Sequence, residues 1–114
     1  MKRAEAPGRK IERRAAWALR LHGWRILGKR LRAAAGEVDL VACRGRIAAF
    51  TAVKWRKRSE DRDLAIDHFR RRCVAAAAKM LAPRFARPHD NIRIDAMRLA
   101  PGRPPRHLVH VWQP

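Results

Sequence analysis

Apolar β-type residues form two short runs in the middle of the chain, residues 36–42 and residues 47–54. The four residues between them include a glycine, and this spacing is typical of a β-hairpin. We therefore predict two antiparallel strands joined by a turn at residues 43–46. This hairpin is the clearest feature of the sequence.

Four positions of the hairpin bear on function. Successive side chains of a strand point to opposite faces, so Glu37 and Asp39 share a face of the first strand, and Ala52 and Lys54 share a face of the second. If the hairpin closes, the acid and the lysine can meet. A carboxylate and a lysine on neighbouring strands suit metal-assisted phosphodiester cleavage, in which the acid binds Mg²⁺ and the lysine orients the attacking water.

Residues 10–22 show helical periodicity. The apolar positions are Ile11, Ala15, Ala18, Leu19 and His22. Gly23 is expected to end this helix as the residue after its C-cap. Glu12 lies at the edge of the apolar stripe, where a glutamate is most often a solvated partner of a residue one turn away. Its position alone favours that role over one in a site.

Loose alternation over residues 24–32 predicts a strand before the hairpin, and residues 33–35 fit either its continuation or a loop. Helical periodicity returns over residues 59–81. The apolar positions are Ile66, Phe69, Cys73, Ala76 or Ala77, and Met80. Acidic residues at the start of this segment suit the helix dipole, and Pro83 is expected to stop the helix.

The remaining residues predict a loop at 84–90, a strand at 91–99, a turn at 101–105 and a short final strand at 107–112. The predicted order is therefore α-β-β-β-α-β-β. This is an α/β fold in which a mixed β-sheet is flanked by helices.

The charge of the chain is strongly unbalanced. There are 28 Lys and Arg against 10 Asp and Glu, which gives a formal net charge of +18. Such a surface attracts polyanions, and nucleic acid is the partner we expect first. The alternative is a generically basic chain that uses Arg and Ala freely. A lipid surface fits less well, because neither predicted helix has a wide apolar face opposite a cationic one.

The length of 114 residues fits a single domain with one core. Residues 1–9 are basic and lack periodicity, so we expect a flexible arm there and one domain over residues 10–114. No run is apolar enough for a membrane span or a signal peptide, and a cytoplasmic protein without a membrane partner is expected. Cys43 and Cys73 lack metal-site spacing and would be reduced in that compartment.

Two groups of residues are candidates for contact with phosphates or bases: Trp55, Arg56, Lys57, Arg58, Arg70, Arg71 and Arg72. Trp55 could stack on an unpaired base, although an aromatic residue at a strand end more often packs against the core. The three arginines of the second helix could line a phosphate track, although such a run is most often a solvated face.

Four motifs together resemble the YraN family. They are GEVDLV at residues 36–41, FTAVKWR at 50–56, a loose match of IERRA at 11–15 to the family's G-E-x-x-A, and RIDA at 93–96. The resemblance covers about residues 8–112. It implies the restriction-endonuclease-like fold, similar to archaeal Holliday-junction resolvases, with a site of the PD-(D/E)XK type.

By that resemblance, Asp39 and Lys54 match the acid and the lysine of the site, and Glu12 matches a helical glutamate that assists the metal. Ala52 departs from the pattern, because the family has a glutamate there that is a principal metal ligand. Glu37 is a candidate substitute on the face of Asp39. Mg²⁺ sites often use only one or two carboxylates plus waters and substrate phosphates, so the loss need not abolish metal binding. We expect Mg²⁺ or Mn²⁺, held by Asp39 and Glu12, to bind weakly because a principal ligand is missing.

The sequence therefore predicts a nucleic-acid-binding protein with an endonuclease-like fold and a degenerate, weakly active or inactive site. DNA is the favoured partner, and the resolvase resemblance suggests branched DNA. Two alternatives remain open. One is an active Mg²⁺-dependent endonuclease or resolvase that uses a substitute acid such as Glu37. The other is a basic assembly factor that binds RNA or protein without site chemistry.

Overall fold

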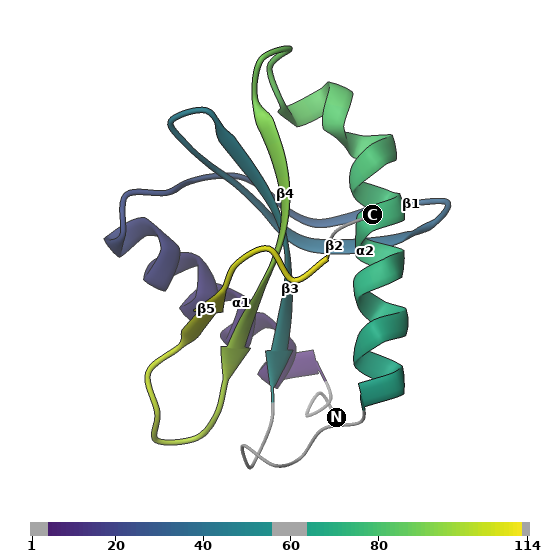
Figure 1. Cartoon of the computed structure of the whole chain (residues 1–114). Helices are drawn as coiled ribbons and strands as arrows, with labels where there is room; N and C mark the ends of the chain where they lie inside the picture. Colours follow the sequence, from purple (N-terminus) through teal and green to yellow (C-terminus); the bar gives the residue numbers. More distant parts are fainter. Residues whose placement is uncertain (1–4, 56–63, 113–114) are drawn as a thin grey trace.

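The computed structural model describes residues 5–55 and 64–112, with the backbone alone at residues 5–9 and 64–68. Its elements follow the predicted order α-β-β-β-α-β-β, which is confirmed (Figure 1). They are α1 (Glu5–Leu21), β1 (Arg25–Ala33), β2 (Gly36–Arg44), β3 (Ile47–Trp55), α2 (Leu64–Phe85), β4 (Asn91–Leu99) and β5 (Arg106–Leu108).

The strands form one five-stranded sheet in the order β1-β2-β3-β4-β5. The first three form an antiparallel meander, because short turns join them. β4 lies parallel to β3, and a parallel pair needs a crossover connection, which here contains α2. β5 returns antiparallel to β4. The predicted mixed sheet is therefore confirmed.

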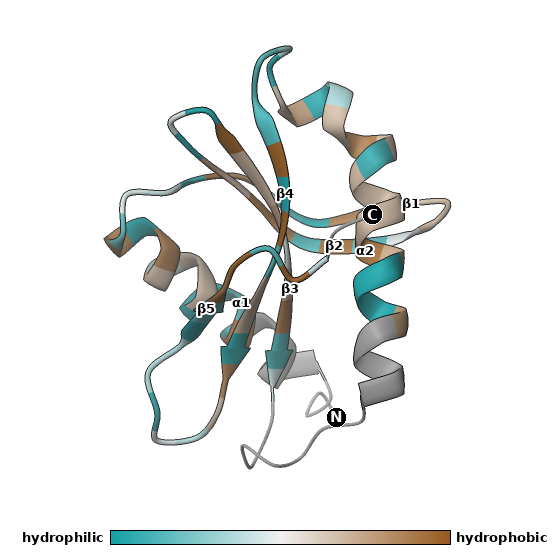
Figure 2. Ribbon diagram, viewed as in Figure 1, coloured by the Kyte–Doolittle hydropathy of each residue, from teal (hydrophilic) through white to brown (hydrophobic). Residues whose placement is uncertain are grey.

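The sheet lies between the two helices, and a separate core fills each side. The α1 core consists of Ala15, Ala16, Leu19, Trp24, Leu40, Ala42, Ala49, Met97 and Leu99. The α2 core consists of Val38, Val41, Ala48, Phe50, Val74, Ala77, Ala78, Leu81 and Ile94. Figure 2 shows hydrophobic positions along β3 and β4, where the helices cover them. Of the described helices, neither is long and apolar enough to span a membrane.

α2 approaches the sheet closely because small residues face it. A Cβ atom added at Gly36 would lie 2.8 Å from the carbonyl oxygen of Cys73, a backbone atom that cannot turn aside. Alanines 77 and 78 of α2 are also buried. The glycine at the start of β2 thus sets the distance between strand and helix.

The end of α1 follows the prediction at Gly23, which has a φ of 88°. The amide of Gly23 donates to the carbonyl of Arg20, and the amide of Trp24 donates to the carbonyl of Leu19. These two bonds satisfy carbonyls that the last turn leaves open. The helix begins at Glu5, so the predicted start at residue 10 was five residues late.

The predicted arm over residues 1–9 therefore overlaps the helix at residues 5–9, and its first four residues lie outside the described residues. Apolar periodicity missed the first turn because that turn need not contact the core. Pro7 does not prevent a helical start, since the first amides of a helix have no partner within it.

The prediction that Pro83 stops the second helix was wrong, since α2 continues to Phe85. One amide is lost at the proline, but the chain stays helical beyond it, and the amide of Ala86 still donates to the carbonyl of Ala82 at 2.8 Å. Phe85 packs into the α2 core and stabilises the last turn. The predicted start of this helix, residues 59–63, lies outside the described residues.

The turn of the predicted hairpin is shorter than the sequence suggested. Arg44 pairs with Ile47, so the turn after β2 has two residues, not four, and Gly45 adopts a φ of 61° there. Residues 34–35 form the turn before β2, which settles their assignment as a turn. The final strand is shorter than the predicted 107–112, because His110 has a left-handed φ of 52° and interrupts the extended chain.

Candidate functional site

The sheet splits between β2 and β3. Their ladder ends at the pair Leu40 and Thr51. Beyond it, β2 continues to pair with β1, and β3 continues to pair with β4. Figure 1 shows β1 and β2 running across the direction of β3 and β4. We call the point where the strands separate the fork; it comprises Glu37, Asp39 and Ala52.

Asp39 is the residue that closes the ladder at the fork. Its Oδ2 accepts a hydrogen bond of 2.7 Å from the amide of Val53, in place of a strand carbonyl. The pKa of Asp39 is raised above its ordinary value, chiefly because the side chain is desolvated by burial. The hydrogen bond from Val53 opposes this effect. The negative charge of Glu37 raises the pKa further, and the positive charge of Arg70 lowers it. The carboxylate is thus held in a fixed orientation but is costly to ionise.

The fork opens into a cavity of about 170 Å³ beside α2. Its lining residues are Glu37, Asp39, Ala52, Phe69, Arg70, Cys73 and Val74. The predicted acid, the predicted substitute acid and the departing alanine therefore share one small hollow. Arg70 brings a positive charge from the helix to its rim.

Glu12 reaches the fork from α1. Burial raises its pKa, the negative charge of Asp39 raises it further, and the charge of Arg30 lowers it in part. Arg30 forms an ion pair with it, with 3.1 Å between Nε and Oε1. The buried Oε1 nevertheless accepts no well-directed hydrogen bond from the described residues. The sequence pattern favours a solvated glutamate at this position, but the side chain is only 16% exposed.

Arg30 lies beside the fork, and no sequence motif pointed to it. Lys29 pairs with Leu40 and Leu31 pairs with Val38, so Arg30 lies across from Asp39 on β1. It has a φ of 49°, a left-handed conformation that side chains other than glycine rarely adopt. Such backbone strain is concentrated at functional sites. No pattern in the sequence signals this conformation.

Lys54 and Glu37 differ in their surroundings. Lys54 lies near the end of β3, two residues after Ala52, and is only 5% exposed. Glu37 is exposed, and its Oε2 accepts a 3.0 Å hydrogen bond from Nε of Arg32 on β1. Glu37 is thus accessible to a ligand, at the cost of a solvent-exposed pair that contributes little.

The predicted nucleic-acid contacts that the structure describes have different surroundings. Trp55 is half-buried and packs against the α1 core, as the packing alternative expected. Arg70 lines the fork cavity, whereas Arg72 lies over the ring of Phe69 at 5.5 Å. The Nε of Arg71 is buried and has no hydrogen-bond partner among the described residues. The connector Arg56, Lys57 and Arg58 lies outside the described residues.

The residues of the fork do not complete a protein-held metal centre. The unsatisfied Oε1 of Glu12 and the fixed Asp39 are suitable oxygen donors. Ala52, however, has no side-chain oxygen, so it cannot serve as a third metal ligand beside Glu12 and Asp39. Within the described residues, no group of three or more His, Cys, Asp or Glu side chains is arranged to hold a metal ion.

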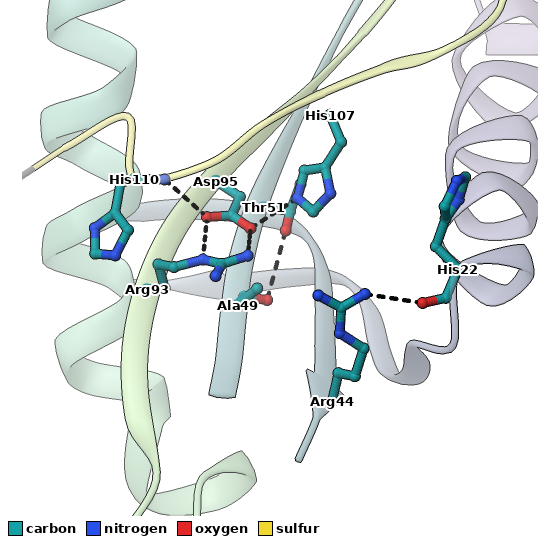
Figure 3. Close-up of polar contacts among 8 residues, drawn as sticks. All are labelled: His22, Arg44, Ala49, Thr51, Arg93, Asp95, His107 and His110. Carbon is teal, nitrogen blue, oxygen red and sulfur yellow. Dashed lines mark hydrogen bonds and ion pairs between the residues drawn. The ribbon is translucent and has the colours of Figure 1, made fainter. Parts of the chain in front are cut away.

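A second polar group, which the sequence analysis did not identify, surrounds Asp95 on β4 (Figure 3). Asp95 is fully buried. Arg93 binds it bidentately at 2.9 and 2.8 Å, Nε2 of His107 lies 2.7 Å from Oδ2, and the amide of His110 donates to Oδ1 at 3.1 Å. Burial alone would raise the pKa of Asp95, but these bonds hold it below its ordinary value. The available signal was the spacing of Arg93 and Asp95, which are two residues apart on one strand and therefore share a face.

Comparisons with known proteins agree with the motifs. The family model for "Uncharacterised protein family UPF0102" matches residues 11–99. The UPF0102 protein of Sphingopyxis alaskensis is 74% identical over 111 residues, which is 97% of this chain and 96% of that protein. The UPF0102 protein of Erythrobacter litoralis is 51% identical over 111 residues, with coverage of 97% and 96%. That of Caulobacter vibrioides is 43% identical over 110 residues, with coverage of 96% and 88%. The chain belongs to the UPF0102, or YraN, family.

Proposed function

We propose that this protein binds nucleic acid and carries a nuclease-like site that is incomplete. The fold and the motifs fit the restriction-endonuclease-like class with a PD-(D/E)XK site. The observation that carries the proposal is the fork: Asp39 is fixed at the point where β2 and β3 separate, and Ala52 stands across from it where a second acid is needed.

The chemistry of the fork supports weak or absent cleavage. Two partly buried acids with raised pKa values, Glu12 and Asp39, share the site, and a cation would relieve the repulsion between their negative charges. Without a side-chain oxygen at position 52, an Mg²⁺ or Mn²⁺ ion would depend on waters and on the phosphates of the substrate. Metal affinity is therefore expected to be low without DNA.

The net charge of +18 supports binding through phosphates. With about six phosphates neutralised on duplex DNA, log K should fall against log salt with a slope of roughly −5. A mobility-shift titration measures this slope. Binding that is unchanged between low and moderate salt would overturn the proposal of phosphate-based recognition.

The chemistry is tested by cleavage of a labelled branched DNA with Mg²⁺ and with Mn²⁺. We expect little product from the native protein and none from Asp39→Asn. Asp39→Asn should still bind DNA at least as tightly, because it removes a negative charge. If both proteins bind DNA and respond to Mg²⁺ and Mn²⁺ in the same way, the result would favour the basic assembly factor instead.

A second candidate function is an active endonuclease that uses Glu37 in place of the missing acid. It is favoured by one observation, that Glu37 lines the same cavity as Asp39 and Ala52. In that case the native protein should cleave efficiently, and Glu37→Gln should abolish cleavage as fully as Asp39→Asn.

A further inference from the structure

A second cavity, of about 290 Å³, lies on the α1 side of the sheet, whereas the fork cavity lies beside α2. It forms where the end of α1 meets β2, β4 and the start of β5. Its principal lining residues are His22, Trp24, Arg44, Arg93, Met97 and His107. Of the described residues that line it, none is acidic.

Trp24 is the platform of this cavity. It is only 3% exposed. The guanidinium of Arg44 lies 4.6 Å from its ring centroid and that of Arg93 lies 5.3 Å away, while His107 approaches edge-on. The indole is thus occupied by cations and is not free to stack on a base. Its role is to hold two guanidinium groups beside one hollow.

Asp95 and the end of α1 fix the directions of these cations. Arg93 uses Nε and Nη2 on Asp95, and His107 uses Nε2 on the same carboxylate (Figure 3). Arg44 uses Nη1 on the carbonyl of His22. None of these contacts occupies Nη1 of Arg93, Nδ1 of His107, or Nε and Nη2 of Arg44.

The charges do not cancel. The carboxylate of Asp95 offsets one of the two guanidinium charges, so the group around the cavity stays positive. Two guanidiniums and an imidazole with fixed orientations are the donors that recognise a compact oxyanion. An anion that entered would meet donors already ordered by Asp95 and Trp24, and would lose little affinity to ordering them.

We propose that this cavity binds a phosphate monoester. Its volume is close to the lower end of small-molecule pockets, about 300 Å³, which leaves room for a phosphate and an attached sugar but not for a duplex. The phosphate can come from the 5′ end of a nucleic-acid strand or from a free nucleotide. The proposal does not rest on nuclease chemistry at the fork.

The first experiment maps the site by NMR, with inorganic phosphate and with a nucleoside 5′-monophosphate as probes at constant ionic strength. We expect saturable shifts at the indole N–H of Trp24 and at Nε of Arg44. If both probes saturate, the protein recognises the phosphate group. If the nucleotide binds more tightly than inorganic phosphate, the protein also contacts the attached nucleoside. Shifts that are scattered over the basic surface and do not saturate would overturn the proposal.

The second experiment compares a 5′-phosphorylated oligonucleotide with its 5′-hydroxyl counterpart. The phosphorylated strand should bind about tenfold more tightly, as expected for one or two added charge-assisted hydrogen bonds. Arg44→Gln should remove this preference. Arg46→Gln is the matched control, because Arg46 belongs to the same hairpin, is exposed and does not line the cavity.

The control should weaken both strands equally and leave their ratio unchanged. An equal loss of preference in Arg44→Gln and Arg46→Gln would refute the site. No preference in the native protein, together with saturable nucleotide binding in the first experiment, would assign the phosphate to a free nucleotide; no preference and no saturation would refute the site. If the melting curve shows that Arg44→Gln does not fold, Arg44→Lys is used instead. It keeps the positive charge and tests the loss of the planar guanidinium donors. Asp39→Asn should leave the preference intact, so failure here and failure of the fork proposal are distinguishable.

Discussion

Asp95→Asn should lower the free energy of unfolding more than replacing an exposed acidic residue by its amide does. The carboxylate is fully buried and receives two bonds from Arg93, one contact from His107 and one bond from the amide of His110. Asparagine keeps one acceptor oxygen and replaces the other with an NH₂ group that cannot accept. At least one donor of this set then faces another donor, and the charge of Arg93 stays buried.

The magnitude follows from the burial of the pair. The Arg93 side chain is 14% exposed and Asp95 is 0% exposed. Removing one partner of a buried ion pair costs about 3–5 kcal/mol in the free energy of unfolding. A domain of this size has roughly 5–15 kcal/mol in total, and the melting temperature should fall by roughly 12–40 °C.

Urea and thermal denaturation followed by circular dichroism measure this loss. The control is Glu37→Gln, which breaks an ion pair of 3.0 Å to Arg32 whose side chains are 51% and 85% exposed. An exposed pair contributes about 0–1 kcal/mol, so the control should unfold almost as the native protein does. A loss below about 1 kcal/mol in Asp95→Asn, or one equal to the control, would refute this account of a buried ionic network.

The pH dependence of the same group has a definite sign. Because the folded pKa of Asp95 lies below its ordinary value near 3.8, the stability that it contributes is present above that value. It is lost as the pH falls through the folded pKa. Denaturation curves of the native protein and Asp95→Asn should therefore converge in strong acid, and a constant difference at all pH values would contradict the argument.

Three further predictions concern the fork and the approach of α2. Asp39→Asn should raise the free energy of unfolding at pH 7, because the raised pKa of Asp39 makes ionisation costly, and the gain should vanish in denaturation curves below its ordinary pKa of 3.8. Gly36→Ala should cost about 1–3 kcal/mol in urea denaturation, since its Cβ would lie 2.8 Å from the Cys73 carbonyl; an unchanged midpoint would show that α2 can shift freely. Ala52→Glu should increase Mn²⁺ affinity in calorimetry by completing the acids of the fork, and no gain would mean that the assigned geometry is wrong.

Much of the fold was predictable because it depends on local patterns. Alternation located the strands, and their order was confirmed. Gly23 was identified as the residue after the helix C-cap because only a residue that tolerates a positive φ suits that position. The strand at residues 91–99 was predicted with its correct bounds. These features need only the period of the side chains and the preferences of single residues.

Tertiary contacts decided the features that local rules missed. Pro83 lies within a helix because Phe85 beyond it packs into the α2 core. The last strand is short because His110 turns into a left-handed conformation, where its amide meets Asp95. In both places a contact with a distant residue outweighs the local preference, as packing commonly outweighs propensity.

The same division holds for the sites. The alternation of side chains predicted that Glu37 and Asp39 share one face, and the sequence set Ala52 on the neighbouring strand. It did not show that β2 and β3 separate after Leu40, so that the side chain of Asp39, not its backbone, bonds to β3. The positive cavity around Trp24 could not be predicted either, because its residues come from α1, three strands and the loops between them, and only the packed sheet brings them together.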